Sequence, residues 1–137
     1  MRLRLDGDIL HVHSDGYLDV AGTKQITAVY QSVIEHFGYL LLRLDLSKST
    51  GVSLDARRFG AEWAKSRLEV HATAATGASL IVRMFVGLMF RTSQLLANNP
   101  TTEMHFAIDE EDAIKWLSAQ RPRVLAAAAR HHKAGFA

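Results

Sequence analysis

The sequence contains no cysteine, which excludes a disulfide framework, a thiol nucleophile and a cysteine-ligated zinc or iron–sulfur centre. Only two of its 137 residues are proline, and no proline-rich or glycine-rich linker divides the chain. The most apolar run, from Met84 to Phe90, is too short to cross a bilayer. The charged start of the chain lacks the apolar stretch of a secretory signal. We therefore expect one globular domain in the cytoplasm, with no membrane span.

The excess of positive over negative charge lies at the end of the chain. Residues 1–118 carry 12 Lys and Arg against 14 Asp and Glu, whereas residues 119–137 carry four basic residues and no acid. A nucleic-acid-binding domain places a basic face within its folded part, so no nucleic-acid partner is expected. The change in composition predicts a domain over residues 1–118, followed by a basic C-terminal helix or tail over residues 119–137.

Alternating apolar and polar residues predict a hairpin at the N-terminus. The turn is the Asp-Gly at Asp6-Gly7, and a second Asp-Gly at Asp15-Gly16 predicts a bend or bulge farther along the strand. Residues 39–45 are almost continuously apolar, as expected for a central strand covered on both faces. Further strands are predicted over residues 70–76 and 104–108.

Helical patterns alternate with these strands. The first predicted helix has Asp19 or Thr23 as its cap and Gly38 as its stop, and the second begins at Ser53. A third is predicted over residues 79–97, and a fourth follows the acidic run 109–112, which suits a helix N-terminus. We expect Pro122 to interrupt the fourth pattern, so that residues 124–133 form a separate Ala-rich helix. The fold class is α/β: a mixed, mostly parallel five-stranded sheet with an N-terminal hairpin and about four flanking helices.

Four short motifs in this order carry a resemblance to a known family. They are Gly16-Tyr17-Leu18-Asp19, the strand ending Leu44-Asp45-Leu46-Ser47, the turn Gly77-Ala78-Ser79, and the stretch from Phe106 through Asp109-Glu110-Glu111-Asp112 to Trp116-Leu117. Together they resemble the STAS domains, in particular the SpoIIAA-like branch, also described as STAS/SEC14-like. The resemblance covers residues 2–118.

The resemblance implies a small cytosolic module without enzymatic activity. Anti-sigma factor antagonists of this type bind a kinase-like anti-sigma partner and are switched by phosphorylation at the start of the second helix. In this sequence Thr50, before Gly51, aligns with the modified residue, and Lys48 replaces the preceding Asp of the family motif. Because the Asp-Ser-Ser-Gly motif is missing, we expect Ser47, Ser49 and Thr50 to be exposed but not stoichiometrically phosphorylated.

Ligands of open α/β sheets bind beyond the carboxyl ends of the strands, where helix N-termini offer free N–H groups. Three predicted loops lie there, over residues 45–53, 76–79 and 109–112. The candidate residues for a phosphorylated or anion-binding loop are Asp45, Ser47, Ser49, Thr50, Gly51, Ser53, Gly77 and Ser79. The alternative is that Ser53, Ser79 and Asp109 are ordinary helix caps, since no nucleotide-binding glycine motif is present.

The predicted helix over residues 79–97 has more apolar surface than contact with a sheet requires. Its polar residues form a single stripe with a spacing of four. The excess apolar surface can pack under the C-terminal helix, form an interface between two chains, or line a pocket for an apolar ligand. The candidate residues for this face are Met84, Phe85, Leu88 and Met89. We expect them to be buried by a second chain or by the C-terminal helix.

No group of residues has the pattern of a catalytic or metal site. His11 and His13 share one strand face, and His131 and His132 are adjacent, but spacing supplies no third ligand for either pair. The nucleophile motif G-x-S-x-G is absent. We therefore expect no enzyme, metal or cofactor. The sequence favours a regulatory or protein-interaction module whose partner is a protein or a second copy, and the alternative is a carrier or sensor for an apolar small molecule or lipid.

Overall fold

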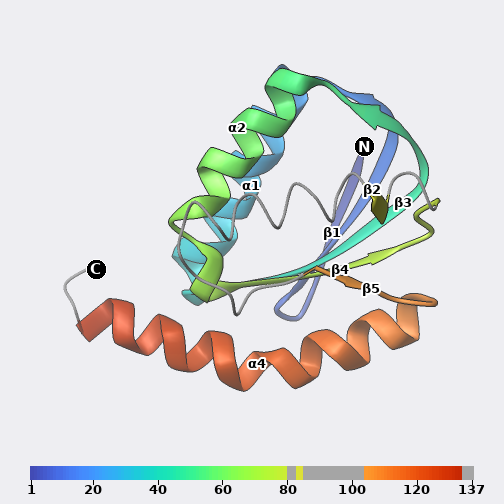
Figure 1. The fold of residues 1–137 in the computed structure, drawn as a ribbon. Helices are drawn as coiled ribbons and strands as arrows, with labels where there is room; N and C mark the ends of the chain where they lie inside the picture. Colours follow the sequence, from blue (N-terminus) through green and yellow to red (C-terminus); the bar gives the residue numbers. More distant parts are fainter. Residues whose placement is uncertain (80–82, 85–103, 134–137) are drawn as a thin grey trace.

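The computed structural model describes residues 1–79, 83, 84 and 104–133, and it places one sheet between helices on its two faces (Figure 1). The elements are β1 (Arg2–Asp6), β2 (Ile9–Leu18), α1 (Val20–Phe37), β3 (Leu40–Val52), α2 (Leu54–Lys65), a 3-10 turn η1 (Leu68–Val70), β4 (His71–Thr76), β5 (His105–Phe106) and α4 (Glu110–Lys133). The strand order is β1-β2-β3-β4-β5. Among the strands of the described residues, only β1 and β2 pair antiparallel, which confirms the mixed, mostly parallel sheet with an N-terminal hairpin.

The described residues form three α-helices, against the four or so that the sequence predicts. Most of the helix predicted over residues 79–97 lies outside the described residues, and Phe85, Leu88 and Met89 fall there. Met84 is described, and 62% of its surface is exposed. The C-terminal helix therefore does not bury Met84 within a single chain, whereas burial by a second chain stays a prediction.

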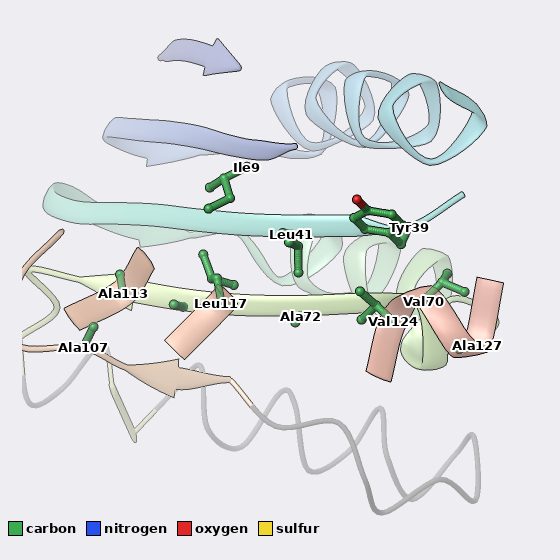
Figure 2. Close-up of a cluster of buried hydrophobic side chains, with 11 residues drawn as sticks. Ile9, Tyr39, Leu41, Val70, Ala72, Ala107, Ala113, Leu117, Val124 and Ala127 are labelled. Carbon is green, nitrogen blue, oxygen red and sulfur yellow. The ribbon is translucent and has the colours of Figure 1, made fainter. Parts of the chain in front are cut away.

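Each face of the sheet has its own apolar core, because successive residues of a strand point to opposite faces. Leu40 and Leu42 pack with residues of β2 and α1, whereas Leu41 packs on the other face with residues of β4 and α4. Figure 2 shows this second core, to which Leu41 of β3 and Leu117 and Val124 of α4 belong. The continuous apolar run at the start of β3 is therefore buried on both sides, as the sequence predicts.

The predicted helix ends are confirmed by their hydrogen bonds. The Asp19 carboxylate accepts from the Gly22 amide at 2.8 Å and caps α1. Gly38 ends α1 in the left-handed region at φ +86°, which a residue with a Cβ adopts at a cost. The Ser53 hydroxyl accepts from the Ala56 amide at 3.0 Å and caps α2.

The prediction of a loop over residues 45–53 is wrong, because β3 continues as a strand as far as Val52. β2 also runs on past Asp15-Gly16 to Leu18, so it supplies the missing hydrogen-bond partner for the extension. The register shifts twice, between His13 and Asp15 and between Gly16 and Tyr17, and each shift leaves extra residues on β3. The bulge predicted in the strand at Asp15-Gly16 therefore lies on the partner strand β3, and the β2–β3 pairing continues through it.

The interruption predicted at Pro122 is also wrong, because α4 is one helix with Pro122 inside it. Proline removes one amide donor and favours a bend, and Figure 1 shows α4 bent along its length. The bend lets both halves lie on the sheet, and Val124 and Ala127 are fully buried beyond the proline. The boundary predicted at residue 118 thus falls inside one helix.

Candidate functional site

The carboxyl edge of the sheet brings together two of the three segments predicted to bind an anion. A Cβ on Gly77 would lie 2.8 Å from the Cβ of Ser47, and Gly77 has φ +70°, so only glycine fits this approach. Ser47 and Thr50 are exposed, whereas Ser49 is half-buried. Ser53 is occupied as a cap.

Asp45 organises this edge through both carboxylate oxygens. Its Oδ1 accepts from the Ser47 amide at 3.0 Å and from the Ser47 hydroxyl at 2.7 Å, and its Oδ2 lies 3.0 Å from His13 Nδ1. Burial raises the pKa of the Asp45 carboxyl, but the hydrogen bonds from Ser47 and His13 outweigh it and hold the pKa below its ordinary value. Asp45 is therefore an ionised acceptor.

This chain of contacts contains the three residue types of a hydrolase triad in the wrong order. In a working triad the imidazole lies between the hydroxyl and the carboxylate, so that it can take the proton of the nucleophile. Here Asp45 lies between Ser47 and His13. An ionised carboxylate of lowered pKa is a poor base for a serine hydroxyl.

The third segment predicted to bind an anion, at the start of α4, consists of helix-capping groups. The Asp109 carboxylate accepts from the Asp112 amide at 2.8 Å, and the Asp112 carboxylate accepts from the Ile108 amide at 3.0 Å. These acids occupy two of the amides that an anion would use. The alternative predicted for Asp109, an ordinary cap, is confirmed.

Exposed apolar residues lie where β2 and β3 end and α2 begins. Tyr17 is 64% exposed and Leu54 is 52% exposed. Tyr17 pairs with Gly51, and a Cβ on Gly51 would lie 3.4 Å from the tyrosine ring, so the ring lies close to this glycine. Lys48 and Thr50 are exposed in the same stretch of β3. We call these five residues the β2–β3 end surface.

A second group of side chains, which sequence reasoning did not assemble, lies on the α4 side of the sheet. Arg4, His11 and Arg43 are cross-strand neighbours on β1, β2 and β3, and Glu110 of α4 lies against all three. His11 and His13 do share a face, as predicted. The sequence feature that pointed to the other members of this group was Arg43, a charged residue inside an apolar strand.

His11 and Arg43 are buried in this group. Burial is the main cause that lowers the pKa of His11, and the charges of Arg4 and Arg43 lower it further. Arg43 donates to the Thr76 hydroxyl at 3.3 Å, which ties the guanidinium to β4. Within the described ranges, no group of three or more metal-ligating side chains converges on a point.

An apolar cavity of about 180 Å³ lies between α1, α2 and the sheet. Its lining includes Val12, Tyr30, Leu42 and Trp63. Pockets for drug-sized ligands have roughly 300 to 1,000 Å³. The cavity is smaller than that, so it does not favour the predicted alternative of an apolar ligand. None of the helices in the described part of the chain is long and apolar enough to span a bilayer.

The chain matches known proteins in structure but not in sequence. No protein-family model and no curated protein matches the sequence. An uncharacterized protein of the DUF3478 family from Shewanella loihica PV-4, described as having a SpoIIAA-like fold, superposes with a TM-score of 0.61 at 19% identity, over 85% of this chain and 90% of that one. This chain has a SpoIIAA-like fold. The anti-sigma factor antagonist SpoIIAA in its unphosphorylated form superposes with a TM-score of 0.50 at 16% identity, over 85% of this chain and 96% of SpoIIAA.

The STAS-like, SpoIIAA-like fold predicted from the four motifs is thus confirmed. Within it, Thr50 occupies a β-bulge of β3, because Gly16 pairs with Ser49 and Tyr17 with Gly51. A bulge re-aims a side chain relative to the regular strand. Thr50, which the resemblance aligns with the modified residue of the antagonists, is exposed at this bulge.

Proposed function

We propose that this chain is a non-catalytic regulatory module that acts in the cytoplasm by binding a protein partner through the β2–β3 end surface. The proposal draws on the SpoIIAA-like fold, one of whose neighbours is an anti-sigma factor antagonist. The observation that carries it is the exposure of Tyr17, near the end of β2, and of Leu54, at the start of α2, together with the exposed polar residues of β3.

The physical argument concerns apolar surface in water. A large apolar side chain forgoes roughly 1.5 to 3 kcal/mol when it stays exposed. Tyr17 and Leu54 are both more than half exposed. Tyrosine is enriched at protein interfaces because it combines a large apolar ring with a hydroxyl. Lys48 and Thr50 supply the polar rim that surrounds such a contact.

The order of the Ser47, Asp45 and His13 contacts supports a role without catalysis. Their hydrogen bonds brace the carboxyl edge of the sheet, and the group beside the serine hydroxyl is the weakly basic Asp45 carboxylate and not an imidazole. These hydrogen bonds hold the side chains of His13, Asp45 and Ser47 together, on the same strands as the proposed contact surface. Self-association through Met84, Phe85, Leu88 and Met89 is a separate proposal, for which the exposure of Met84 is the support.

Affinity purification from the source cell, followed by titration of the purified partner, tests the proposal. Tyr17→Ala and Leu54→Ala together should weaken binding by about tenfold or more, since truncation of interface anchors typically has this effect. Leu125→Ala is the matched control, because Leu125 is a similarly exposed apolar residue on α4. Equal affinity of all three proteins would contradict the proposed surface. Native mass spectrometry that finds a bound lipid and no protein partner would favour the apolar-ligand alternative.

A further inference from the structure

One carboxylate oxygen of Glu110 lies against three nitrogen-bearing side chains. Glu110 Oε1 is 3.1 Å from Arg4 Nη2, 3.4 Å from His11 Nδ1 and 3.4 Å from Arg43 Nη1. The three partners belong to three neighbouring strands and are paired in register, so the sheet itself fixes their spacing. Arg4 and Arg43 donate to this oxygen, and His11 Nδ1 also lies 3.4 Å from Arg43 Nη1. Two arginine donors fixed around one carboxylate oxygen have the geometry of an anion-binding site.

Two of the three nitrogen-bearing side chains, those of His11 and Arg43, are built into the core, whereas the Arg4 side chain is 60% exposed and the acceptor is also partly exposed. Arg43 is 7% exposed and His11 is fully buried. Arg43 Nε has no hydrogen-bond partner among the described residues, so the guanidinium has donor capacity that Glu110 does not use. The side chain of Glu110 is 46% exposed and lies in the first turn of α4, where a change of rotamer moves its carboxylate into water.

A pocket of about 560 Å³ opens over this array. Its lining consists of Arg2, Leu3, Arg4, His13, Arg43 and Glu110. The volume falls within the range of roughly 300 to 1,000 Å³ that small-ligand sites occupy. The lining carries three arginines and one acid, and the Asp45 carboxylate lies 4.0 Å from Arg43 Nη2 behind it, so the pocket keeps an excess of positive charge when Glu110 leaves it.

We propose that this pocket binds the phosphate or carboxylate group of a small molecule, and that Glu110 occupies the oxyanion position when the ligand is absent. Arginine suits both groups, because its planar fork donates two parallel hydrogen bonds to either. The ligand would take over the donors of Arg4 and Arg43 and displace the Glu110 side chain. The pocket shares no residue with the β2–β3 end surface, so this proposal stands apart from the proposed function.

Anion titrations of matched variants test the proposal. The probes are inorganic phosphate and succinate, each compared with sodium chloride at the same ionic strength, because ionic strength alone changes charge pairing. Either anion should raise the melting temperature of Glu110→Ala and bind it about tenfold more tightly than it binds the wild-type protein. Arg4→Ala should weaken binding at least fivefold. Glu111→Ala is the control, because Glu111 is an exposed acid in the same turn of α4.

A response to phosphate alone assigns a phosphoryl ligand, and a response to succinate alone assigns a carboxylate ligand. If Glu110→Ala does not fold, Glu110→Gln keeps the side-chain volume, and NMR shifts of the β1 and β2 amides report binding. Glu110→Ala or Glu110→Gln that responds to neither anion beyond Glu111→Ala overturns the proposal.

Discussion

Arg121 of α4 and Asp8 of the turn between β1 and β2 form a two-pronged ion pair, although 113 positions separate them in the sequence. Arg121 Nε lies 2.6 Å from Asp8 Oδ2, and Nη2 lies 2.7 Å from Oδ1. The Tyr39 hydroxyl donates to the same carboxylate at 2.7 Å. The pair therefore connects α4, in the basic C-terminal region, to the turn of the first hairpin and to Tyr39 just before β3.

We predict that Arg121→Ala lowers the free energy of unfolding by about 1 to 2 kcal/mol. Hydrogen bonds to charged groups contribute roughly 1.5 to 3 kcal/mol to the free energy of unfolding. The Arg121–Asp8 pair is partly exposed to solvent, which reduces its contribution. Urea denaturation measures the difference. Arg130→Ala is the control, because Arg130 is an exposed arginine on the same helix. Equal loss in the two variants would show that helix charge, and not the Asp8 contact, is responsible.

The half of α4 beyond Pro122 is expected to be part of the core. Val124 is fully buried, whereas its neighbour Leu125 is 46% exposed. Val124→Ala should cost about 2 kcal/mol, because it removes two buried carbons and leaves a cavity. Leu125→Ala should cost less than about 0.5 kcal/mol, as surface substitutions do. Thermal or urea unfolding separates the two, and equal costs would mean that this half of the helix is not docked.

Local signals predicted most of the fold correctly. Asp19 and Ser53 mark helix starts through hydrogen bonds of their own side chains, and Gly38 marks a helix end because it has no Cβ and adopts a left-handed backbone angle. The apolar residues before Arg43 predict a strand that is buried on both faces, because apolar side chains on both faces of a strand must be covered on both sides. These features are encoded within a few residues, so sequence patterns are enough to find them.

The wrong predictions concern contacts between distant segments. The polar residues after Asp45 have the composition of a loop, and they form a strand only because β2 continues beside them. Pro122 is tolerated because residues on both sides of it pack on the sheet. The contacts of Glu110 with Arg4 and Arg43 depend on where α4 starts relative to three strands. The spacing of residues in the sequence does not reveal where a helix begins relative to strands that are distant in the chain.

His71 should make the protein less stable as the pH falls. The side chain is buried, and burial is the main cause that lowers its pKa from 6.5 to about 4, with a smaller effect from the charge of Arg123. The folded protein therefore keeps His71 neutral while the unfolded chain takes up the proton. The contribution to stability is present above pH 6.5 and is lost as the pH falls toward 4, by about 2 kcal/mol between pH 7 and pH 5.

Urea denaturation of the wild-type protein and of His71→Gln at pH 7 and pH 5 measures this effect. The variant should be less stable at pH 7, because His71 also contacts the Thr73 hydroxyl, but it should lose less stability at pH 5. His36→Gln is the control, since His36 is exposed on α1. The same pH dependence in His71→Gln and the wild type would exclude His71 as the cause.

The last prediction concerns phosphorylation at the carboxyl end of β3, where we expect no stoichiometric modification. A phosphate on Ser47 would place a charge of about −1.5 to −2 beside the ionised Asp45 and would remove the 2.7 Å hydrogen bond between them. Thr50 is exposed and has Lys48 nearby, so its modification would be tolerated, and the missing family motif is the reason to expect none. Intact-mass measurement after incubation with cell lysate and ATP decides the matter, with Thr50→Ala and Ser47→Ala as the variants. A quantitative gain of one phosphate that Thr50→Ala abolishes and Ser47→Ala retains would show that the bulge in β3 carries a switch.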